Sequence, residues 1–333
     1  MEKKIILLVC HVSALVGIGH LSRLLALAHF LRNSKKYNVE FLIFGEEFKT
    51  HELEFYNVFK EPISSDFDKS LKRIVKKVSP SMVIFDLYPK LLPPNFKGLL
   101  QWVQKRDIRI VGIDGLVDYC NFLDHLWMPT FYYDVNKTPK CLHKITSGWD
   151  TLLMQKRLPT KNWIPGNKVL ILTGGSDSTN LGKVLPNLLD LSLRSGTIID
   201  WVQGPFSKPP SIPKNPRLHW NIELSPSHLD ELIVQSNYVL TIFGISFFEV
   251  LQYGLPAVVF SPYGKKDNEE LEALSKEDVG LVKENLESAI EGIIELMDRD
   301  ELAKKYSENS LRKLSINGAS NLAKKLELIM GDS

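Results

Sequence analysis

Cysteine is scarce in this chain, and the few cysteines lie far apart. The 333 residues include Cys10, Cys120 and Cys141, and no two of them form a CxxC pair. An odd number of cysteines at wide spacing favours neither a disulfide framework nor a structural zinc site. We therefore expect a protein of the reducing cytoplasm that is not held together by disulfides.

The chain also lacks a long apolar run. No stretch approaches the roughly eighteen uninterrupted apolar residues of a membrane span. Lys3 and Lys4 followed by the apolar residues 5–9 resemble the start of a signal peptide, but His11 interrupts that run. We interpret this segment as a first strand. The expected protein is cytoplasmic, has no integral membrane segment, and is at most peripheral at the inner membrane face.

The charges are too nearly balanced to indicate nucleic-acid binding. Lys and Arg number 41 against 39 Asp and Glu, which leaves a net charge of +2. A nucleic-acid-binding domain normally has a strongly basic face. The basic cluster at residues 72–77 alternates with apolar residues, as on the solvent side of an amphipathic helix. The length suffices for two globular domains of about 150 residues each.

The first half of the chain alternates strand and helix signals. Hydrophobic patterning predicts strands at 5–9, 39–44, 82–85 and 108–113, and helices at 67–78 and 99–104. This alternation is typical of a doubly wound parallel sheet. Ligands of such sheets bind beyond the carboxyl ends of the strands, where Asp86 and Asp114 would project. Each aspartate would also serve well as a cap for the following turn or helix.

The sequence G-I-G-H-L-S-R-L-L-A-L-A, at residues 17–28, directly follows the first predicted strand. Gly17 and Gly19 permit a sharp strand-to-helix turn, and the first amides of the helix would point at a ligand there. His20 would stand at the entrance of the helix, close to Arg23. A helix-capping His20 and a solvated Arg23 explain the same residues without a ligand, and such short motifs also match by chance.

Prolines and fading periodicity between residues 129 and 165 mark a domain boundary. After it, strands are predicted at 168–172, 198–202, 217–220, 238–241 and 257–260, and helices at 181–193 and 229–235. The second half therefore repeats the architecture of the first. Two amphipathic helices, at 302–314 and 319–330, complete the chain.

Glycine turns follow two strands of the second half. Gly174, Gly175, Ser176 and Asp177 lie between a strand and a helix, where a turn can hold an anion or allow the domains to approach closely. A plain turn capped by Asp177 or Ser178 is the alternative.

The second turn reads Phe243-Gly244-Ile245-Ser246-Phe247-Phe248-Glu249. The first amides of this helix are suited to a diphosphate and Glu249 to the hydroxyls of a ribose. A capping box between Ser246 and Glu249 is the alternative. That box does not explain why Gly254-Leu255-Pro256 comes five residues later.

These motifs carry a resemblance to a known superfamily. The E-x-x-x-x-G-L-P segment from Glu249 to Pro256, preceded by Gly244, resembles the nucleotide-binding segment of GT-B enzymes, including the transferase that adds N-acetylglucosamine to make lipid II. The order and spacing of further motifs are most similar to the UDP-sugar hydrolase of pseudaminic acid biosynthesis and to spore-coat polysaccharide glycosyltransferases. These motifs are the 17–28 segment, Ile113-Asp114-Gly115-Leu116, L-T-G-G-S-D at 172–177, and Asn268-Glu269.

The resemblance implies a fold and an activity. The fold would be GT-B: two Rossmann-like, doubly wound parallel-sheet domains facing a cleft, at residues 1–150 and 165–315, with a hinge between them and a last helix at 319–330 that crosses back to the first domain. His20 would be the catalytic base, because an imidazole can accept a proton at neutral pH. Gly244, Ser246 and Glu249 would hold the nucleotide of a UDP-sugar, and Asn268 and Glu269 would lie near its sugar. The scheme needs no metal and no cofactor.

The chain departs from the hydrolase pattern at several positions. Residues 11–15 read H-V-S-A-L where that pattern has Arg-x-Asp-Ala-Ser, Ile245 replaces a small residue of the phosphate turn, and Glu269 replaces a glutamine. Three hypotheses follow: a glycosyltransferase that passes a sugar to a surface-glycan acceptor, a hydrolase that releases a 2,4-diacetamido-type sugar for nonulosonic acid synthesis, and a non-catalytic nucleotide-sugar binder. The departures favour the transferase.

Overall fold

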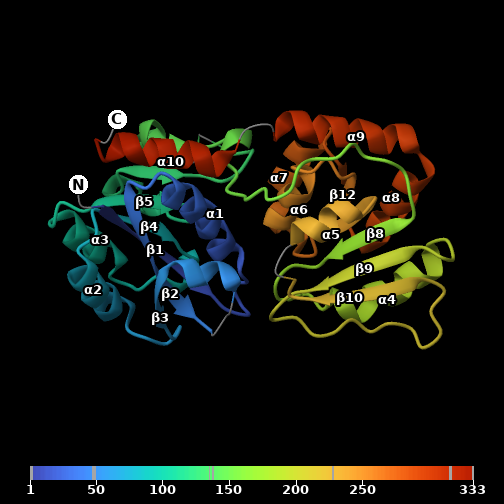
Figure 1. Ribbon diagram of the computed structural model, residues 1–333, viewed down its shortest axis with the longest axis horizontal. Helices are drawn as coiled ribbons and strands as arrows, with labels where there is room; N and C mark the ends of the chain where they lie inside the picture. The colour runs from blue at the N-terminus through green and yellow to red at the C-terminus, as the bar shows by residue number, and fades with distance from the viewer. Residues whose placement is uncertain are drawn as a thin grey trace. The chain divides into compact units, whose positions relative to one another are not determined.

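The computed structural model describes residues 3–46, 50–134, 136, 139–226, 229–314 and 317–331. The chain divides into two compact units, Met1–Met154 with Ile316–Ser333, and Gln155–Ser315 (Figure 1). Each unit is a parallel β-sheet covered by helices. Among the described residues, no helix is both long enough and apolar enough to cross a membrane.

The first unit is built on a parallel sheet with the strand order β3-β2-β1-β4-β5-β6-β7. Its strands are β1 (Lys4–Val12), β2 (Tyr37–Gly45), β3 (Asn57–Glu61), β4 (Met82–Asp86), β5 (Arg109–Ile113), β6 (His125–Trp127) and β7 (Ile145–Thr146). Its α-helices are α1 (Gly19–Asn33), α2 (Phe67–Val78), α3 (Phe96–Gln104) and α10 (Gly318–Ile329). Its 3₁₀ helices are η1 (His51–Phe55), η2 (Pro89–Leu91), η3 (Val117–Phe122), η5 (Pro139–Lys144) and η6 (Trp149–Thr151).

The apolar run of β1 is long because both faces of this central strand are covered. Leu7 and Val9 belong to a core that includes residues of α2 and α3, while α1 packs against β1 and β2. Strands buried on both faces read as continuous apolar runs, without alternation of polar residues. Because β1 is buried, the position of its carboxyl end at Val12 is fixed. The turn that leads to α1 starts from this fixed point.

Helix α10 comes from the end of the chain but packs on the first unit, beside α1 (Figure 1). Lys36 Nζ lies 3.3 Å from Glu327 Oε2, and Asn321 Nδ2 donates to the carbonyl oxygen of Asp150 at 3.1 Å. Gly318 lies so close to the backbone of Leu152 that a side chain at this position would meet its carbonyl oxygen at 2.4 Å. The first unit is thus made from two separate stretches of the chain.

A disulfide joins Cys120 of η3 to Cys141 of η5. The prediction that no disulfide holds this protein was wrong for this pair. The two cysteines are 21 residues apart, and they meet because η3 and η5 pack together at one side of the first unit. Cys10 is buried as a free thiol in β1.

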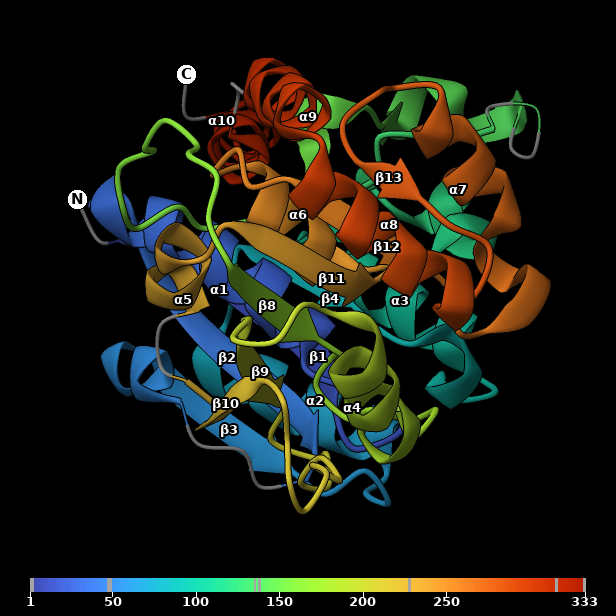
Figure 2. The same ribbon diagram turned by 90° about the vertical axis from the view of Figure 1, so that its right-hand side faces the viewer.

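The second unit repeats this design, with the strand order β10-β9-β8-β11-β12-β13 (Figure 2). Its strands are β8 (Lys168–Leu172), β9 (Ile198–Gln203), β10 (His219–Leu224), β11 (Tyr238–Ile242), β12 (Ala257–Phe260) and β13 (Leu281–Val282). Its helices are α4 (Leu181–Ser192), α5 (Leu229–Gln235), α6 (Ile245–Leu251), η7 (Gly264–Asp267), α7 (Asn268–Ser275), α8 (Leu286–Asp298) and α9 (Asp300–Lys313). Side chains of α4, α8 and α9 form one core with the sheet.

Candidate functional site

Both sheets have a topological switch point, the place where the strand order reverses. It lies between β1 and β4 in the first sheet and between β8 and β11 in the second. In open parallel sheets, ligands bind outside the carboxyl ends of the strands at this point. The predicted site residues of each unit follow these strands, so each unit is described in turn.

The turn from β1 into α1 has the conformation that its glycines allow. Gly17 has φ of +77°, in the left-handed region, and its amide donates to the carbonyl oxygen of Ser13 at 2.7 Å. A side chain would strain the backbone at this position. Helix α1 begins at Gly19, so His20 is its second residue. The turn therefore presents His20 at the carboxyl edge of the sheet.

His20 is hydrogen-bonded to the carboxylate of Asp86, the last residue of β4. His20 Nδ1 lies 2.5 Å from Asp86 Oδ1. Arg23 Nη2 also lies 3.0 Å from His20 Nδ1. We assign the Nδ1 proton to the shorter contact, with Asp86, because an imidazole lone pair facing a carboxylate oxygen at that distance would be repelled. The Nε2 atom of the neutral ring then carries its lone pair as a proton acceptor. The side chain of His20 is 12% exposed to solvent, whereas that of Asp86 is fully buried.

Arg23 links Asp86 to Asp114 and is not the solvated surface charge that the sequence left open. Its Nε and Nη2 donate to the two oxygens of Asp86 at 2.9 and 2.7 Å. Its Nη1 donates to Asp114 Oδ2 at 2.9 Å. Only 14% of the Arg23 side chain is exposed. The first unit therefore brings together four of the predicted residues, and neither aspartate caps a helix here.

The electrostatics of the cluster keep Asp86 ionised. Burial alone raises the pKa of Asp86, but the charges of Arg23 and His20, together with their hydrogen bonds, outweigh it and hold the pKa below its usual value. Burial lowers the pKa of Arg23, and the two aspartates more than compensate and raise it. A permanent carboxylate therefore stands behind the His20 ring.

Asp114 occupies the more open end of this cluster. Its side chain is 44% exposed, and one of its oxygens is held by Arg23. Its backbone has φ of +62°, a conformation that is uncommon for a residue with a side chain. Such strained conformations are often found at functional sites. Asp114 thus combines a fixed orientation with access to solvent.

His11, at the end of β1, is a buried neighbour of the cluster. The amide of Tyr88 donates to His11 Nδ1 at 3.2 Å, so this ring nitrogen is an acceptor. Burial, followed by the charge of His20, lowers the pKa of His11 to about 4. His11 is therefore a neutral, packed residue at neutral pH.

In the second unit, the turn after β8 contains Gly174, Gly175, Ser176 and Asp177. Asp177 Oδ1 and Oδ2 accept the amides of Leu181 and Gly182 at 2.8 Å each. Asp177 therefore caps the start of α4, which was the alternative to a role in ligand binding. Both of its carboxylate oxygens are used in these two hydrogen bonds. Gly174 and Gly175 remain partly exposed at the sheet edge beside the carboxyl end of β11.

The turn after β11 leads through Phe243 and Gly244 into α6. Gly244 precedes the helix, so Ser246 is its second residue and the proposed capping box with Glu249 does not form at this end. Gly254 has φ of +70° and lies against Leu311, where an added side chain would meet that residue at 2.8 Å. The Gly254-Leu255-Pro256 sequence therefore has a packing explanation of its own.

Asn268 and Glu269 begin α7, which follows β12 and η7, and both are exposed. Sequence reasoning missed two neighbours of the same edge. Tyr263 lies 3.2 Å from Ser178, between their hydroxyl oxygens. Thr173, directly after β8, has a buried Oγ1 without a hydrogen-bond partner in the described part of the chain. A hydroxyl next to a glycine turn was the signal that could have found Thr173.

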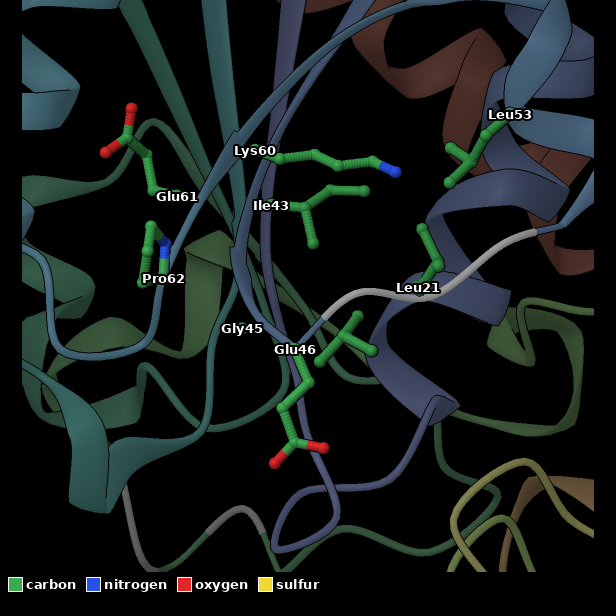
Figure 3. Close-up of a pocket in the computed structure, with 9 residues that line it drawn as sticks. Leu21, Ile43, Gly45, Glu46, Leu53, Lys60, Glu61 and Pro62 are labelled. Atoms are coloured by element: carbon green, nitrogen blue, oxygen red, sulfur yellow. The ribbon is translucent and has the colours of Figure 1, made fainter.

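A pocket of about 200 Å³ was also missed in the first unit (Figure 3). It lies where β1, β2 and β3 end, and its wall includes Leu21, the residue after His20. It was not predicted because β3, which supplies part of its wall, was not predicted.

Solved structures with the same architecture cover nearly the whole chain. The structure of MurG from Acinetobacter baumannii has a TM-score of 0.64 at 12% identity, covering 98% of this chain and 99% of its own. Phytolacca americana UGT2, complexed with UDP-2-fluoroglucose and pterostilbene, has a TM-score of 0.66 at 14% identity, with coverage of 98% and 100%. The S. aureus MnaA–UDP structure has a TM-score of 0.65 at 11% identity, with coverage of 98% and 97%.

No protein-family model matches the sequence, and no curated protein matches it. At 11–14% identity the structural likeness establishes the fold. The chain has the GT-B fold, as the sequence predicted. The resemblance to the narrower hydrolase and spore-coat group stays a prediction.

Proposed function

We propose that this chain is a glycosyltransferase that transfers a sugar from a UDP-sugar to a hydroxyl of a sugar or glycan acceptor, in surface-glycan synthesis. The observation that carries the proposal is the His20–Asp86 pair at the switch point of the first sheet. The surface-glycan context rests on the sequence resemblance alone.

In this proposal His20 is the general base. Its Nε2 takes the proton of the acceptor hydroxyl while the hydroxyl oxygen attacks the anomeric carbon of the donor. The bond between that carbon and the phosphate oxygen of UDP breaks, and UDP leaves with the electron pair. The carboxylate of Asp86 holds the ring by its Nδ1 proton and stabilises the imidazolium that forms. Arg23 keeps Asp86 ionised and fixed in place. The burial of Asp86 strengthens these interactions, because little water competes for the carboxylate.

The second unit would bind the nucleotide. Gly244 and the first amides of α6 form the end of a helix that suits a diphosphate. Ser246 is partly buried at this end, where its hydroxyl can donate to a phosphate oxygen. We assign Glu249, one turn further, to the ribose, and Asn268 and Glu269 to the sugar. Two of the similar structures contain UDP or UDP-2-fluoroglucose, which supports this class of donor.

The test is turnover of a panel of UDP-sugars, with and without acceptor sugars, by the wild-type chain and by His20→Ala. We expect UDP release that depends on acceptor, reduced on the order of a hundredfold or more in His20→Ala, with unchanged UDP binding. His29→Ala, at the other end of α1, is the matched control and should retain full turnover. Unchanged turnover in His20→Ala would remove His20 as the base.

A UDP-sugar hydrolase is the second candidate. The His20–Asp86 pair favours it equally, because Nε2 can deprotonate water as well as a sugar hydroxyl. The same assay separates the two: free sugar and UDP without acceptor indicate hydrolysis, and UDP release that requires acceptor indicates transfer. UDP binding that is accompanied by no turnover would leave a nucleotide-sugar binder.

A further inference from the structure

Within the part of the chain that the structure describes, one charged group that lines the pocket in the first unit has no counterpart. Lys60, in β3, lines the pocket, and no ion pair or hydrogen bond of its ammonium group occurs within the described residues. Figure 3 shows its side chain extending over Ile43 toward Leu53. Lys60 is exposed, so its aliphatic stem lies along the apolar wall while its ammonium group stays accessible to solvent and to a ligand.

The carboxylates of the same pocket do not neutralise Lys60. Glu61 accepts from Ser70 Oγ at 3.0 Å and pairs with Arg73. Figure 3 shows its carboxylate turned away from the Lys60 ammonium group and the carboxylate of Glu46 at the opposite end of the pocket. Glu46 accepts a long hydrogen bond of 3.4 Å from the amide of Ala14 and is exposed.

Most of the rest of the wall consists of buried apolar side chains. Leu21, Ile43 and Leu53 are 1%, 6% and 6% exposed, and Val12 closes the pocket at the end of β1. A ligand in this pocket would pack its apolar surface against these side chains. A hydroxyl group of the ligand would lie near Glu46, and an anionic group would lie near Lys60. The ammonium group of lysine is a common partner of carboxylates and phosphates.

The pocket and the His20–Asp86 pair share helix α1, and β1 lies beside both. Leu21 faces the pocket, and the preceding residue, His20, contacts Asp86. Successive helical side chains point about 100° apart, so α1 can present one residue to each place. Val12 lines the pocket two residues beyond Cys10, which pairs with Asp86 in the sheet register.

We infer that this pocket binds the acidic part of the acceptor, a sugar-sized body with a carboxylate or phosphate that pairs with Lys60. The identification of the ligand as the acceptor rests on the proposed function, whereas its binding does not. The anion specificity follows from Lys60, and the size limit follows from the volume of the pocket.

The test is titration calorimetry on the full chain without a UDP-sugar. The probes are methyl β-D-glucuronide, its neutral counterpart methyl β-D-glucoside, and glucose 6-phosphate. We expect the anionic probes to bind wild type about threefold to fivefold more tightly than the glucoside, because Lys60 is exposed and ion pairs of exposed groups are weak. The two anionic probes distinguish a carboxylate from a phosphate.

Lys60→Met keeps the aliphatic stem and removes the charge, and Lys69→Met is the matched control on the exposed side of α2. We expect Lys60→Met to lose the preference for the anionic probes and Lys69→Met to keep it. Failure of every anionic probe to bind wild type, equal binding of the glucoside, or full binding to Lys60→Met would each overturn the inference.

The two proposals can fail separately. Turnover with neutral acceptors and no anion binding would leave the transferase and remove the pocket. Anion binding that depends on Lys60, without turnover of any UDP-sugar, would leave the pocket and remove the transferase.

Discussion

The carboxyl edges of the two sheets have the same topology but opposite chemistry. In the first unit, charged side chains dominate the edge, and Arg23 ties Asp86 and Asp114 into one ionic cluster around His20. In the second unit, glycine turns and helix ends dominate, and the acidic side chain nearest the turn, Asp177, is used to cap α4. The first edge is thus suited to moving a proton and the second to holding an anion with backbone amides. In the proposed function, one architecture therefore serves two different tasks.

The largest expected effect is that of Asp86→Asn, which removes the charge at the centre of the first edge. Breaking a buried ion pair leaves a poorly compensated charge, here on Arg23, which keeps only its pair with the more exposed Asp114. We expect a loss of about 3 kcal/mol of unfolding free energy. Turnover should fall on the order of a thousandfold, because the His20 ring loses the carboxylate that orients it. Urea unfolding and steady-state kinetics measure the two effects.

Asp114→Asn is the matched control for this change. The Asp114 side chain is 44% exposed, so its ion pair with Arg23 should contribute less than about 1 kcal/mol. Equal unfolding midpoints for Asp86→Asn and wild type would show that the ionic cluster does not stabilise the first unit.

The next effect should make the first unit more sensitive to acid than the second. Burial lowers the pKa of His11 and of His125 to about 4, with further contributions from the charges of His20 and Lys325. An unfolded histidine titrates near pH 6.5. Between these values the unfolded chain binds protons that the folded chain does not, so stability is full above about pH 6.5, falls as the pH drops, and stops falling near pH 4. Each histidine should account for up to about 3 kcal/mol.

Hydrogen exchange followed by mass spectrometry can resolve this difference unit by unit, after correction for the intrinsic pH dependence of exchange. We expect peptides of the first unit to lose protection between pH 6.5 and 4.5 before those of the second, in which His219 is exposed. His125→Asn should flatten the pH dependence, because it removes one of the two groups. Earlier loss of protection in the second unit would contradict the assignment.

The smallest expected effect belongs to the second edge. Ser246→Ala should weaken UDP binding about threefold to tenfold, the usual contribution of one hydrogen bond. Stability should stay the same, because Ser246 does not cap α6. Ser192→Ala, exposed at the end of α4, is the control. Equal UDP affinity of Ser246→Ala and wild type would remove Ser246 from the proposed phosphate site.

The sequence predicts those elements that are buried or capped by local signals. The bounds of α2, α5, β8 and β12 agree with the predicted ranges, since apolar periodicity or apolar runs define them. Strand β3 escaped prediction because it is short and polar at the sheet edge, and β10 lies later than expected because its residues are largely exposed. Helix α8 also went unpredicted, although its capping box at Asn285 and Ser288 is a readable signal.

The candidate site was predictable in position but not in its contacts. Strand ends place His20, Asp86 and Asp114 at one edge, because parallel strands bring their carboxyl ends together. The hydrogen bonds of Arg23 to both aspartates depend on how side chains pack between α1, β4 and β5. The spacing of residues in the sequence does not reveal such packing. The disulfide and the Lys60 pocket depend on neighbours far away in the sequence for the same reason.

The position of α10 bears on how this chain is made. Residues 1–154 leave the ribosome long before α10, which packs against α1 and contacts the backbone of Asp150. Domains generally fold during synthesis, beginning with the N-terminal one. Here the first unit must wait with the α10-binding surface of α1 uncovered until α10 has been synthesised, so a nascent chain stalled before residue 318 would have a finished second unit and an unfinished first.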